Sequence, residues 1–403
     1  MNRHALLGAL PALALALSAC RTAVPAPAVR DRTRIDSAAV ALMAQEHVQG
    51  LALAVIDSGR VVFTSAYGFR NVERKLPLTT RTVMYGASLT KAAVAYLVMQ
   101  YVDEGLLSLD DSLPALLPKP LPEYEDYASV ATDPRWRSLT LRTILNHTTG
   151  FANFRWIEPD KQLRFHSAPG TRYGYSGEGF YILQLVLEAR LKVDVGAEMQ
   201  RRVFDRFGLT RTSMQWRPDF AEDLADGYGA DGTMEPHDER SNVSAAGSMD
   251  TNIDDQARLW AGIVRGEGLS SRARTELVRP QHPIVSLSQF PTMRETRGGF
   301  DTTVSLSAAL GVVTFLDPRW GPSWFKGGHN DQTGNMLICQ ERAKRCVIFL
   351  ANDVRAERIY PELARRILGE TTMPWAWEYD WLNAVSCPCP CPCPSYCFNF
   401  GFR

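Results

Sequence analysis

The stretch YGASLTKAAVAYLVMQYVDEG, residues 85–105, places a serine at the start of an apolar helix and a lysine three positions later. Apolar side chains then recur at the i, i+3, i+4 and i+7 spacing that predicts an amphipathic helix, and Gly105 is a typical left-handed stop. The simplest interpretation of Ser88 is a helix cap, because a serine hydroxyl at that position accepts a hydrogen bond from an unpaired backbone N–H.

The position of Lys91 does not fit a simple cap. It lies in the first helical turn, where the positive end of the helix dipole disfavours a cation. Residues three apart are neighbours on a helix, so Lys91 and Ser88 lie near the same face. A lysine held there should have a lowered pKa and could act as a base toward the adjacent hydroxyl. The pair therefore indicates a nucleophilic serine.

The composition is that of an ordinary globular protein. The chain has 403 residues, 45% of them hydrophobic, with 44 basic and 44 acidic side chains. This length suits one large domain or two medium ones. The net charge of zero gives no general attraction to nucleic acid, so we expect no nucleic-acid partner. The seven histidines form no H-x-H or H-E-x-x-H pattern, so we expect no metal, no cofactor and no metallohydrolase.

The first 34 residues predict an export signal and a tether. Residues 1–19 have a basic start and an apolar run too short to span a membrane, which is typical of a secretory signal peptide. The sequence LSAC that ends at Cys20 resembles a bacterial lipoprotein box, which implies a lipid on Cys20; the alternative is a plain signal peptide with an incidental cysteine. Residues 20–34 are rich in Pro and Ala and suit a tether. We expect an exported lipoprotein on the periplasmic side of a bacterial membrane, in contact with it only through Cys20.

The other cysteines fall into two groups. Cys339 and Cys346 flank QERAKR between two apolar runs, and if these runs pair as a hairpin the thiols could form a disulfide in an oxidising compartment. Residues 376–403 carry five cysteines that largely alternate with prolines. Their C-x-C spacing could suggest metal binding, but the prolines give a stiff, extended chain that suits a tetrahedral site poorly. We therefore expect a disordered tail.

The order of predicted elements indicates an α/β (α+β) fold. Residues 35–84 hold a helix and a hairpin signal, residues from about 85 to 240 are mainly helical, and strands return between 300 and 370. Strands from both ends of the chain therefore bracket a helical middle. We predict one domain over residues 35–375, with an antiparallel sheet built from both chain ends, flanked by helices, and a mainly helical domain inserted.

Two later motifs hold candidate partners for Ser88. Tyr175 stands just ahead of a helix in YGYSGEGFYILQ, where the alternative is a half-buried tyrosine that bonds the backbone. Lys326 ends a strand in SWFKGGHN, where the alternative is a solvated lysine on an edge strand. The two glycines after Lys326 leave room for another group to approach the backbone closely.

Three motifs follow one another along the chain: Ser88-Leu89-Thr90-Lys91, Tyr175-Ser176-Gly177 and Lys326-Gly327-Gly328. Their order and rough spacing resemble the serine β-lactamase and DD-peptidase superfamily, whose signature includes S-x-x-K and a later K-T-G. The class C β-lactamase-like branch, which includes esterases and D-amino-acid peptidases, is the most similar. LTLRTILNHTTGF and AAGSMDTNIDDQARL also look like that branch. The resemblance covers residues from about 35 to 368 and implies a sheet and a helical domain with a catalytic cleft between them.

The resemblance also implies a role for each side chain. Ser88 would be the nucleophile, Lys91 its proton acceptor and Tyr175 the phenolic acid/base. Lys326 would stabilise the Tyr175 phenolate and meet acidic substrate groups. The backbone N–H groups of Ser88 and His329 would form the oxyanion hole.

Two glycines depart from the family pattern. The middle motif usually ends in asparagine, where this chain has Gly177, and the last motif usually carries a side chain where it has Gly327. The resemblance implies that both positions, like Gly328 and His329, contact the substrate. We expect a monomeric serine hydrolase that forms an acyl-enzyme on a small-molecule or peptide substrate: a β-lactam, an ester or a D-amino-acid peptide. The two missing side chains favour short-chain esters over β-lactams.

Two competing functions stay open. A non-catalytic sensor could use the same cleft to bind cell-wall peptides or β-lactams, although a pure binder needs none of Ser88, Lys91 and Tyr175. A Ser-His-Asp triad could use His147 or His329. However, the sequence has no G-x-S-x-G nucleophile elbow, and His147 fits a hydrogen-bonded structural role better.

Overall fold

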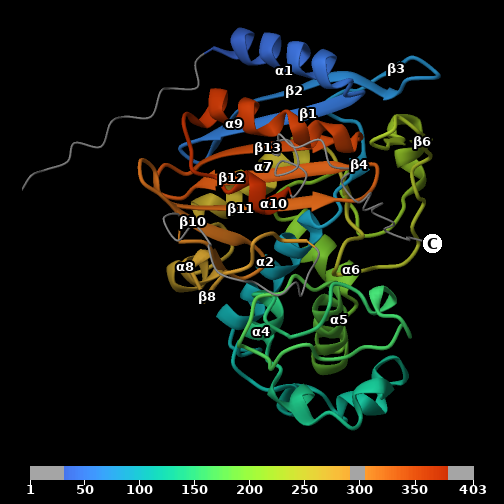
Figure 1. Ribbon diagram of the computed structural model, residues 1–403, viewed down its shortest axis with the longest axis vertical. Helices are drawn as coiled ribbons and strands as arrows, with labels where there is room; N and C mark the ends of the chain where they lie inside the picture. The colour runs from blue at the N-terminus through green and yellow to red at the C-terminus, as the bar shows by residue number, and fades with distance from the viewer. Residues whose placement is uncertain (1–30, 291–304, 380–403) are drawn as a thin grey trace, which may run out of the picture.

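The computed structural model describes residues 31–290 and 305–379 (Figure 1). The strands are β1 (Gly50–Asp57), β2 (Arg60–Asn71), β3 (Leu76–Pro77), β4 (Met84–Tyr85), β5 (Gly227–Tyr228), β6 (Met234–Glu235), β7 (Asp250–Thr251), β8 (His282–Pro283), β9 (Ser307–Ala308), β10 (Val313–Asp317), β11 (Gly321–His329), β12 (Gly334–Gln340) and β13 (Arg345–Ala351). The α-helices are α1 (Arg32–Glu46), α2 (Leu89–Asp103), α3 (Leu113–Leu116), α4 (Leu141–Leu145), α5 (Gly177–Leu191), α6 (Val195–Glu198), α7 (Ile253–Arg265), α8 (Ser271–Val278), α9 (Tyr360–Leu368) and α10 (Trp375–Glu378). A π-helix spans Met199–Phe204, and short 3-10 helices span Leu121–Glu123, Glu125–Val130, Pro134–Ser138, Arg155–Ile157, Pro218–Asp223 and Val354–Arg358.

One antiparallel sheet organises the protein. Within the described residues it has nine strands in the order β3-β2-β1-β13-β12-β11-β10-β9-β8. The N-terminal strand β1 pairs with the C-terminal strand β13, with Leu51 opposite Ala351. Both ends of the chain therefore build the sheet, which confirms the predicted mixed fold. Cys339 and Cys346 lie opposite each other on β12 and β13, and the structure joins them in a disulfide.

Both faces of the sheet are covered by helices. Successive side chains of a strand point to opposite faces. In β1, Leu51 and Leu53 therefore join the cluster that contains α1 and α9, whereas Ala52 and Ala54 join the cluster that contains α2 and α7. Burial on both sides explains why β1 reads as a continuous apolar run instead of an alternating one.

The helical part lies against one side of the sheet. Figure 1 shows α2 descending from the sheet toward α4 and α5, which lie in the lower part of the molecule. α2 is buried along nearly its whole length, because it packs between the sheet and the helical part. Its N-terminus therefore stands at the junction of the two parts, where the sequence places Ser88.

Two predicted boundaries shift. The tether was expected over residues 20–34, but α1 begins at Arg32 with Asp31 as its cap. The disordered tail was expected from residue 376, but α10 continues to Glu378, and Trp377 and Glu378 are buried. The folded body therefore extends through Tyr379, because an apolar segment beyond α9 packs back on the sheet.

The predictions for the two ends of the chain concern residues that the structure does not describe. The signal peptide, Cys20 and the five tail cysteines lie outside the described residues. In the described ranges, no helix combines the length and the apolar character that crossing a bilayer requires.

Candidate active site

Ser88 is presented by a strained turn. Ala87, the residue before it, has a φ of 46°, in the left-handed region that residues other than glycine rarely adopt. Ser88 takes the N-cap position of α2, but its side chain makes no capping hydrogen bond. The interpretation of Ser88 as a simple cap is therefore wrong, because its hydroxyl points away from the helix backbone and toward other side chains. Strain of this kind persists where the surrounding structure holds it, often at a functional site.

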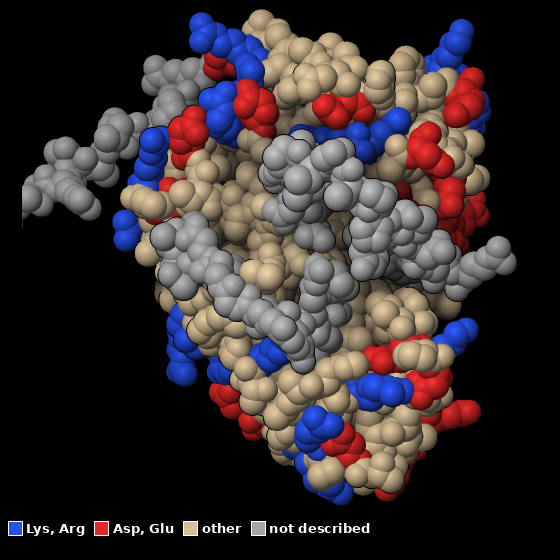
Figure 2. All heavy atoms as spheres, viewed as in Figure 1, with Lys and Arg blue, Asp and Glu red and all other residues tan. Residues whose placement is uncertain are grey.

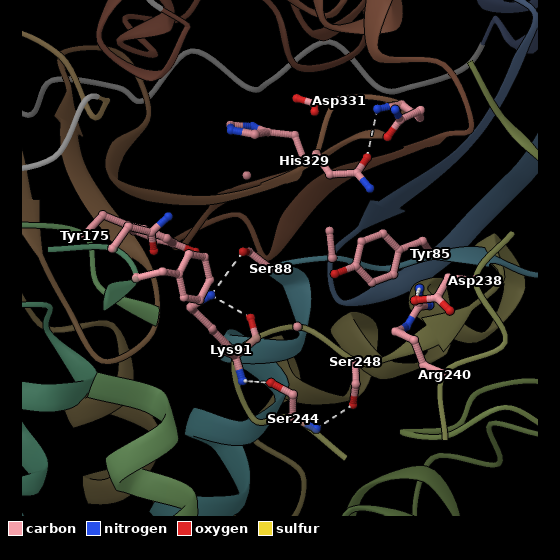
Figure 3. A pocket seen from close by; sticks show the side chains of 18 of the residues that line it. Tyr85, Ser88, Lys91, Tyr175, Asp238, Arg240, Ser244, Ser248, His329 and Asp331 are labelled. Atoms are coloured by element: carbon pink, nitrogen blue, oxygen red, sulfur yellow. Dashed lines mark hydrogen bonds and ion pairs between the residues drawn. The ribbon is translucent and has the colours of Figure 1, made fainter. Parts of the chain in front are cut away.

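Lys91 is the first of these neighbours. Its Nζ lies 3.2 Å from Ser88 Oγ and donates to the carbonyl oxygen of Ala246 at 2.6 Å. The side chain is only 1% exposed, and this burial, together with the charge of Lys326, holds the pKa of Lys91 well below its usual value. A neutral amine is thus stabilised beside the serine hydroxyl. Figure 3 shows the side chains of Ser88, Lys91 and Tyr175 converging.

Tyr175 and Lys326 complete the group. Tyr175 lies just before α5, and its hydroxyl accepts a hydrogen bond from Lys326 Nζ at 3.1 Å. Burial raises the pKa of Tyr175, whereas a hydrogen bond with Ser88 works in the opposite direction. Burial also lowers the pKa of Lys326. The phenol is therefore held protonated next to the serine, with a cation that would stabilise it if it lost its proton.

Gly328 allows the sheet to approach the serine. A Cβ on Gly328 would lie 3.1 Å from the backbone N of Ser88 and 2.9 Å from that of Leu89. Such contacts are tighter than side chains tolerate, so glycine lets the end of β11 lie directly beside the N-terminus of α2. His329, the next residue, lies at the same end of β11. The Ser88 backbone and the last residues of β11 thus face one pocket.

The pocket has a volume of about 880 Å³. Its lining includes Ser88, Lys91, Tyr175, Lys326, Gly327 and His329. Gly177 and Gly328 are not among its lining residues, although Gly328 lies between Gly327 and His329, and Gly177 packs against the lining residue Phe154. The structure therefore brings together the four side chains that the sequence motifs single out.

Comparison with known proteins identifies the family. A family model described as Beta-lactamase matches residues 35–370, which is most of the chain. The chain belongs to the Beta-lactamase family. It is 28% identical over 207 residues to a lovastatin esterase from Penicillium rubens, covering 44% of this chain and 51% of that protein. It is 28% identical over 185 residues to a D-aminopeptidase from Gluconobacter oxydans, covering 44% and 35%. The chain thus spans about half or less of the length of these curated relatives.

Solved structures share the fold of this Beta-lactamase family member. A β-lactamase/D-alanine carboxypeptidase from Pseudomonas syringae has a TM-score of 0.66 at 18% identity, with 85% of this chain and 99% of that chain covered. The penicillin-binding protein homologue from Pyrococcus abyssi also has a TM-score of 0.66, at 19% identity, with 83% and 77% covered. Identities this low show the architecture alone.

The two glycines that depart from the family pattern have their space filled from elsewhere. A Cβ on Gly177 would overlap the ring of Phe154, which stacks on Trp156 with ring centroids 4.1 Å apart. A Cβ on Gly327 would overlap Oε1 of Glu378, from α10. Neither glycine therefore leaves an empty space. A phenyl ring and a carboxylate occupy the positions next to them.

Within the described residues, neither His147 nor His329 forms a triad with Ser88. His147 is buried, and its Nδ1 accepts a hydrogen bond from the backbone N–H of Ser176 at 3.1 Å, which fixes the start of α5. Burial lowers the pKa of His147, so it stays neutral. His329 Nδ1 lies 3.3 Å from Glu357 Oε1. Each histidine thus has a partner other than Ser88, whose described partners are Lys91 and Tyr175.

Sequence reasoning missed three groups at the site: the carbonyl of Ala246, the ring of Phe154 and the carboxylate of Glu378. The Ala246 carbonyl lies in AAGSMDTNIDDQARL, a segment already similar to the family, but a backbone oxygen has no signature of its own. Phe154 and Glu378 reach their glycines only through tertiary packing, and no local motif marks either one.

Proposed function

We propose that the protein is a serine hydrolase that forms an acyl-enzyme on Ser88. The observation that carries this proposal is the 3.2 Å contact between Ser88 Oγ and the Nζ of the buried Lys91. A base within hydrogen-bond reach of a hydroxyl is the usual requirement for an activated serine. Burial, together with the charge of Lys326, holds the pKa of Lys91 well below its usual value and so favours the neutral amine that can accept the proton.

Acylation follows from the same contacts. The Ser88 proton passes to Lys91 Nζ as Oγ bonds to the substrate carbonyl carbon. The backbone N–H groups of Ser88 and His329 would hold the resulting oxyanion. The bond to the leaving oxygen then breaks, and the Tyr175 hydroxyl gives that oxygen a proton. Lys91 is left protonated, and the Tyr175 phenolate lies beside Lys326, 3.1 Å from its Nζ.

Deacylation reverses these proton transfers. A water gives a proton to the Tyr175 phenolate as its oxygen attacks the acyl carbon. Ser88 leaves with the proton held by Lys91, the carboxylic acid is released, and each residue returns to its starting state.

For the substrate we propose a short-chain ester, with β-lactams turned over slowly. The support is the loss of two substrate-facing side chains at Gly177 and Gly327, whose places Phe154 and Glu378 now occupy. A lost hydrogen bond to a neutral group is worth about 0.5–1.5 kcal/mol, and one to a charged group about 1.5–3 kcal/mol. Ester cleavage by Ser88, Lys91 and the backbone N–H groups needs neither side chain. The similarity to a lovastatin esterase points the same way.

A paired turnover assay tests this proposal. Wild type and Ser88→Ala are assayed with p-nitrophenyl butyrate and with a chromogenic cephalosporin. We expect Ser88-dependent turnover of the ester and a kcat/KM for the cephalosporin about 30- to 1000-fold below that of a dedicated β-lactamase. A stable adduct with no turnover of either substrate would instead favour the sensor.

A further inference from the structure

Glu378 lies at the edge of the proposed active site without belonging to any sequence motif. It is 3% exposed, and its Oε2 accepts a hydrogen bond from Gln289 Nε2 at 2.8 Å. Its Oε1 has no hydrogen-bond partner among the described residues and occupies the space that a side chain on Gly327 would need. Gln289 and Gly327 both line the pocket that contains Ser88. A carboxylate oxygen with no donor is thus held directly behind the pocket wall.

Burial raises the pKa of Glu378 itself to about 7, so its negative charge develops as the pH rises through that value. Once ionised, Glu378 raises the pKa of Lys326 against the lowering effect of burial, and it adds to the effect of Glu357 in raising the pKa of His329. The resemblance gives Lys326 the task of meeting an acidic substrate group. A buried negative charge nearby opposes that task, because it offsets the field of the lysine where a substrate anion would bind.

The pocket rim carries the same sign of charge. Carboxylates at Glu235, Asp238, Glu239 and Asp331 line it. The one arginine in the described lining, Arg240, pairs with both Asp250 and Asp238, which leaves Glu235, Glu239 and Asp331 as the rim carboxylates without this partner. Figure 2 shows red acidic side chains gathered on the right-hand side of the molecule, where Figure 1 places β6. An anionic substrate thus meets negative charge at the rim as well as beside Gly327.

We propose that Glu378 is a specificity-determining residue that rejects substrates with an anionic group beside the scissile bond and favours neutral or cationic esters. This inference rests on the proposed function, because it names the substrate class of that site. The site would then discriminate between anionic and neutral esters by repelling the anion, and it would need no additional attractive contact to the neutral ester. The carboxylate stands where related chains carry a side chain that meets substrate, so a substrate anion there would meet a like charge in a poorly hydrated place.

Three acetate esters that differ in leaving-group charge test the proposal. They are 3-acetoxybenzoate (anionic), methyl 3-acetoxybenzoate (neutral) and 3-acetoxy-N,N,N-trimethylanilinium (cationic). Each kcat/KM is divided by the rate of the same ester with hydroxide, which removes intrinsic reactivity. The assays are run at a pH well above the Glu378 pKa of about 7, so that the carboxylate is ionised. In wild type we then expect the kcat/KM of the anionic ester to lie about tenfold or more below that of the neutral one, with the cationic ester equal or better. Glu378→Gln, which keeps the shape and an acceptor for Gln289, should raise the anionic-to-neutral ratio about 5- to 10-fold.

A rim variant is the matched control. Glu239→Gln also removes one negative charge from the pocket, but from an exposed side chain that water and salt screen. It should change the same ratio less than about twofold. A ratio unchanged in Glu378→Gln, or changed equally by Glu239→Gln, would overturn the proposal. A melting curve shows whether each variant is folded.

A binding measurement separates this inference from the proposed function. In Ser88→Ala, equilibrium binding of the same uncleaved esters is measured with and without Glu378→Gln. If the anionic ester binds more weakly than the neutral one, and Glu378→Gln removes that difference, the result supports the inference even if wild type cleaves no ester. Equal binding of all three esters in both backgrounds overturns it, even if Ser88 proves to be the nucleophile.

Discussion

Lys326 Nζ donates a hydrogen bond to the Tyr175 hydroxyl at 3.1 Å, and this contact joins the sheet to the start of α5. The two residues are 151 positions apart in the sequence. The contact places the positive charge of Lys326 next to the phenol that lies beside Ser88. If Tyr175 donates its proton, Lys326 therefore stabilises the phenolate that remains.

Removing either proton-transfer group should slow catalysis more than it weakens binding. Tyr175→Phe and Lys91→Ala should each lower kcat for p-nitrophenyl butyrate by about 10²–10⁴-fold, the usual scale for a lost acid or base. Steady-state kinetics on the purified variants measures this. A decrease in either variant that lies wholly in KM, with kcat unchanged, would assign that residue to binding alone.

The pH profile should report the depressed pKa of Lys91. Neutral Lys91 is the base, so kcat/KM for a neutral ester should be low in acid and rise as Lys91 loses its proton. Because burial lowers that pKa well below 10.5, the rise should be complete far below pH 10.5. In Lys91→Arg the arginine stays protonated, so the variant should lose both the activity and the rise of kcat/KM with pH. A wild-type limb that begins only near the ordinary lysine pKa of about 10.4 would contradict the assignment.

Phe154 should determine whether position 177 accepts a side chain. Gly177→Ala would force its Cβ into the Phe154 ring, and overpacking of this kind destabilises a protein by about 1–3 kcal/mol. Phe154→Ala alone should cost about 3–5 kcal/mol through the cavity it leaves. Because the two residues share one space, the double variant should be more stable than the sum of the single effects allows. Chemical denaturation of the four proteins measures this, and strict additivity would contradict the packing.

The lipid anchor is tested on the full chain. If LSAC is a lipoprotein box, the expressed protein should partition with membranes and incorporate a labelled fatty acid, whereas Cys20→Ala should do neither. The same membrane association and labelling in both forms would rule out lipidation at Cys20.

The sequence predicts those residues of the site that lie in short local motifs. Ser88 and Lys91 are three residues apart on one helix, and the tyrosine and lysine motifs each carry their own glycines. Each motif alone is a weak signal, and it is the resemblance of the three in order to a known family that implies their roles. The predicted sheet also follows from local patterns, because β-rich runs lie at both ends of the chain. The boundary of α10 was missed because its sequence continues into the proline- and cysteine-rich segment without a break in composition.

Phe154 and Glu378 could not have been found in the same way. Phe154 lies 23 positions before Gly177, and Glu378 lies 51 positions after Gly327. Each meets its glycine only because the chain folds, the first in the loop ahead of α5 and the second through packing of α10 on the sheet. A glycine in a motif shows that a side chain is missing there. What fills its space is a tertiary property.

Covalent labelling tests the central claim most directly. Wild type is incubated with an activated p-nitrophenyl phosphonate, and the adduct is weighed as the intact protein and mapped by peptide mass spectrometry. The account predicts one adduct, on the peptide that contains Ser88, formed slowly in Lys91→Ala and not at all in Ser88→Ala. An adduct of the same size that persists in Ser88→Ala, or maps to another serine, would contradict it.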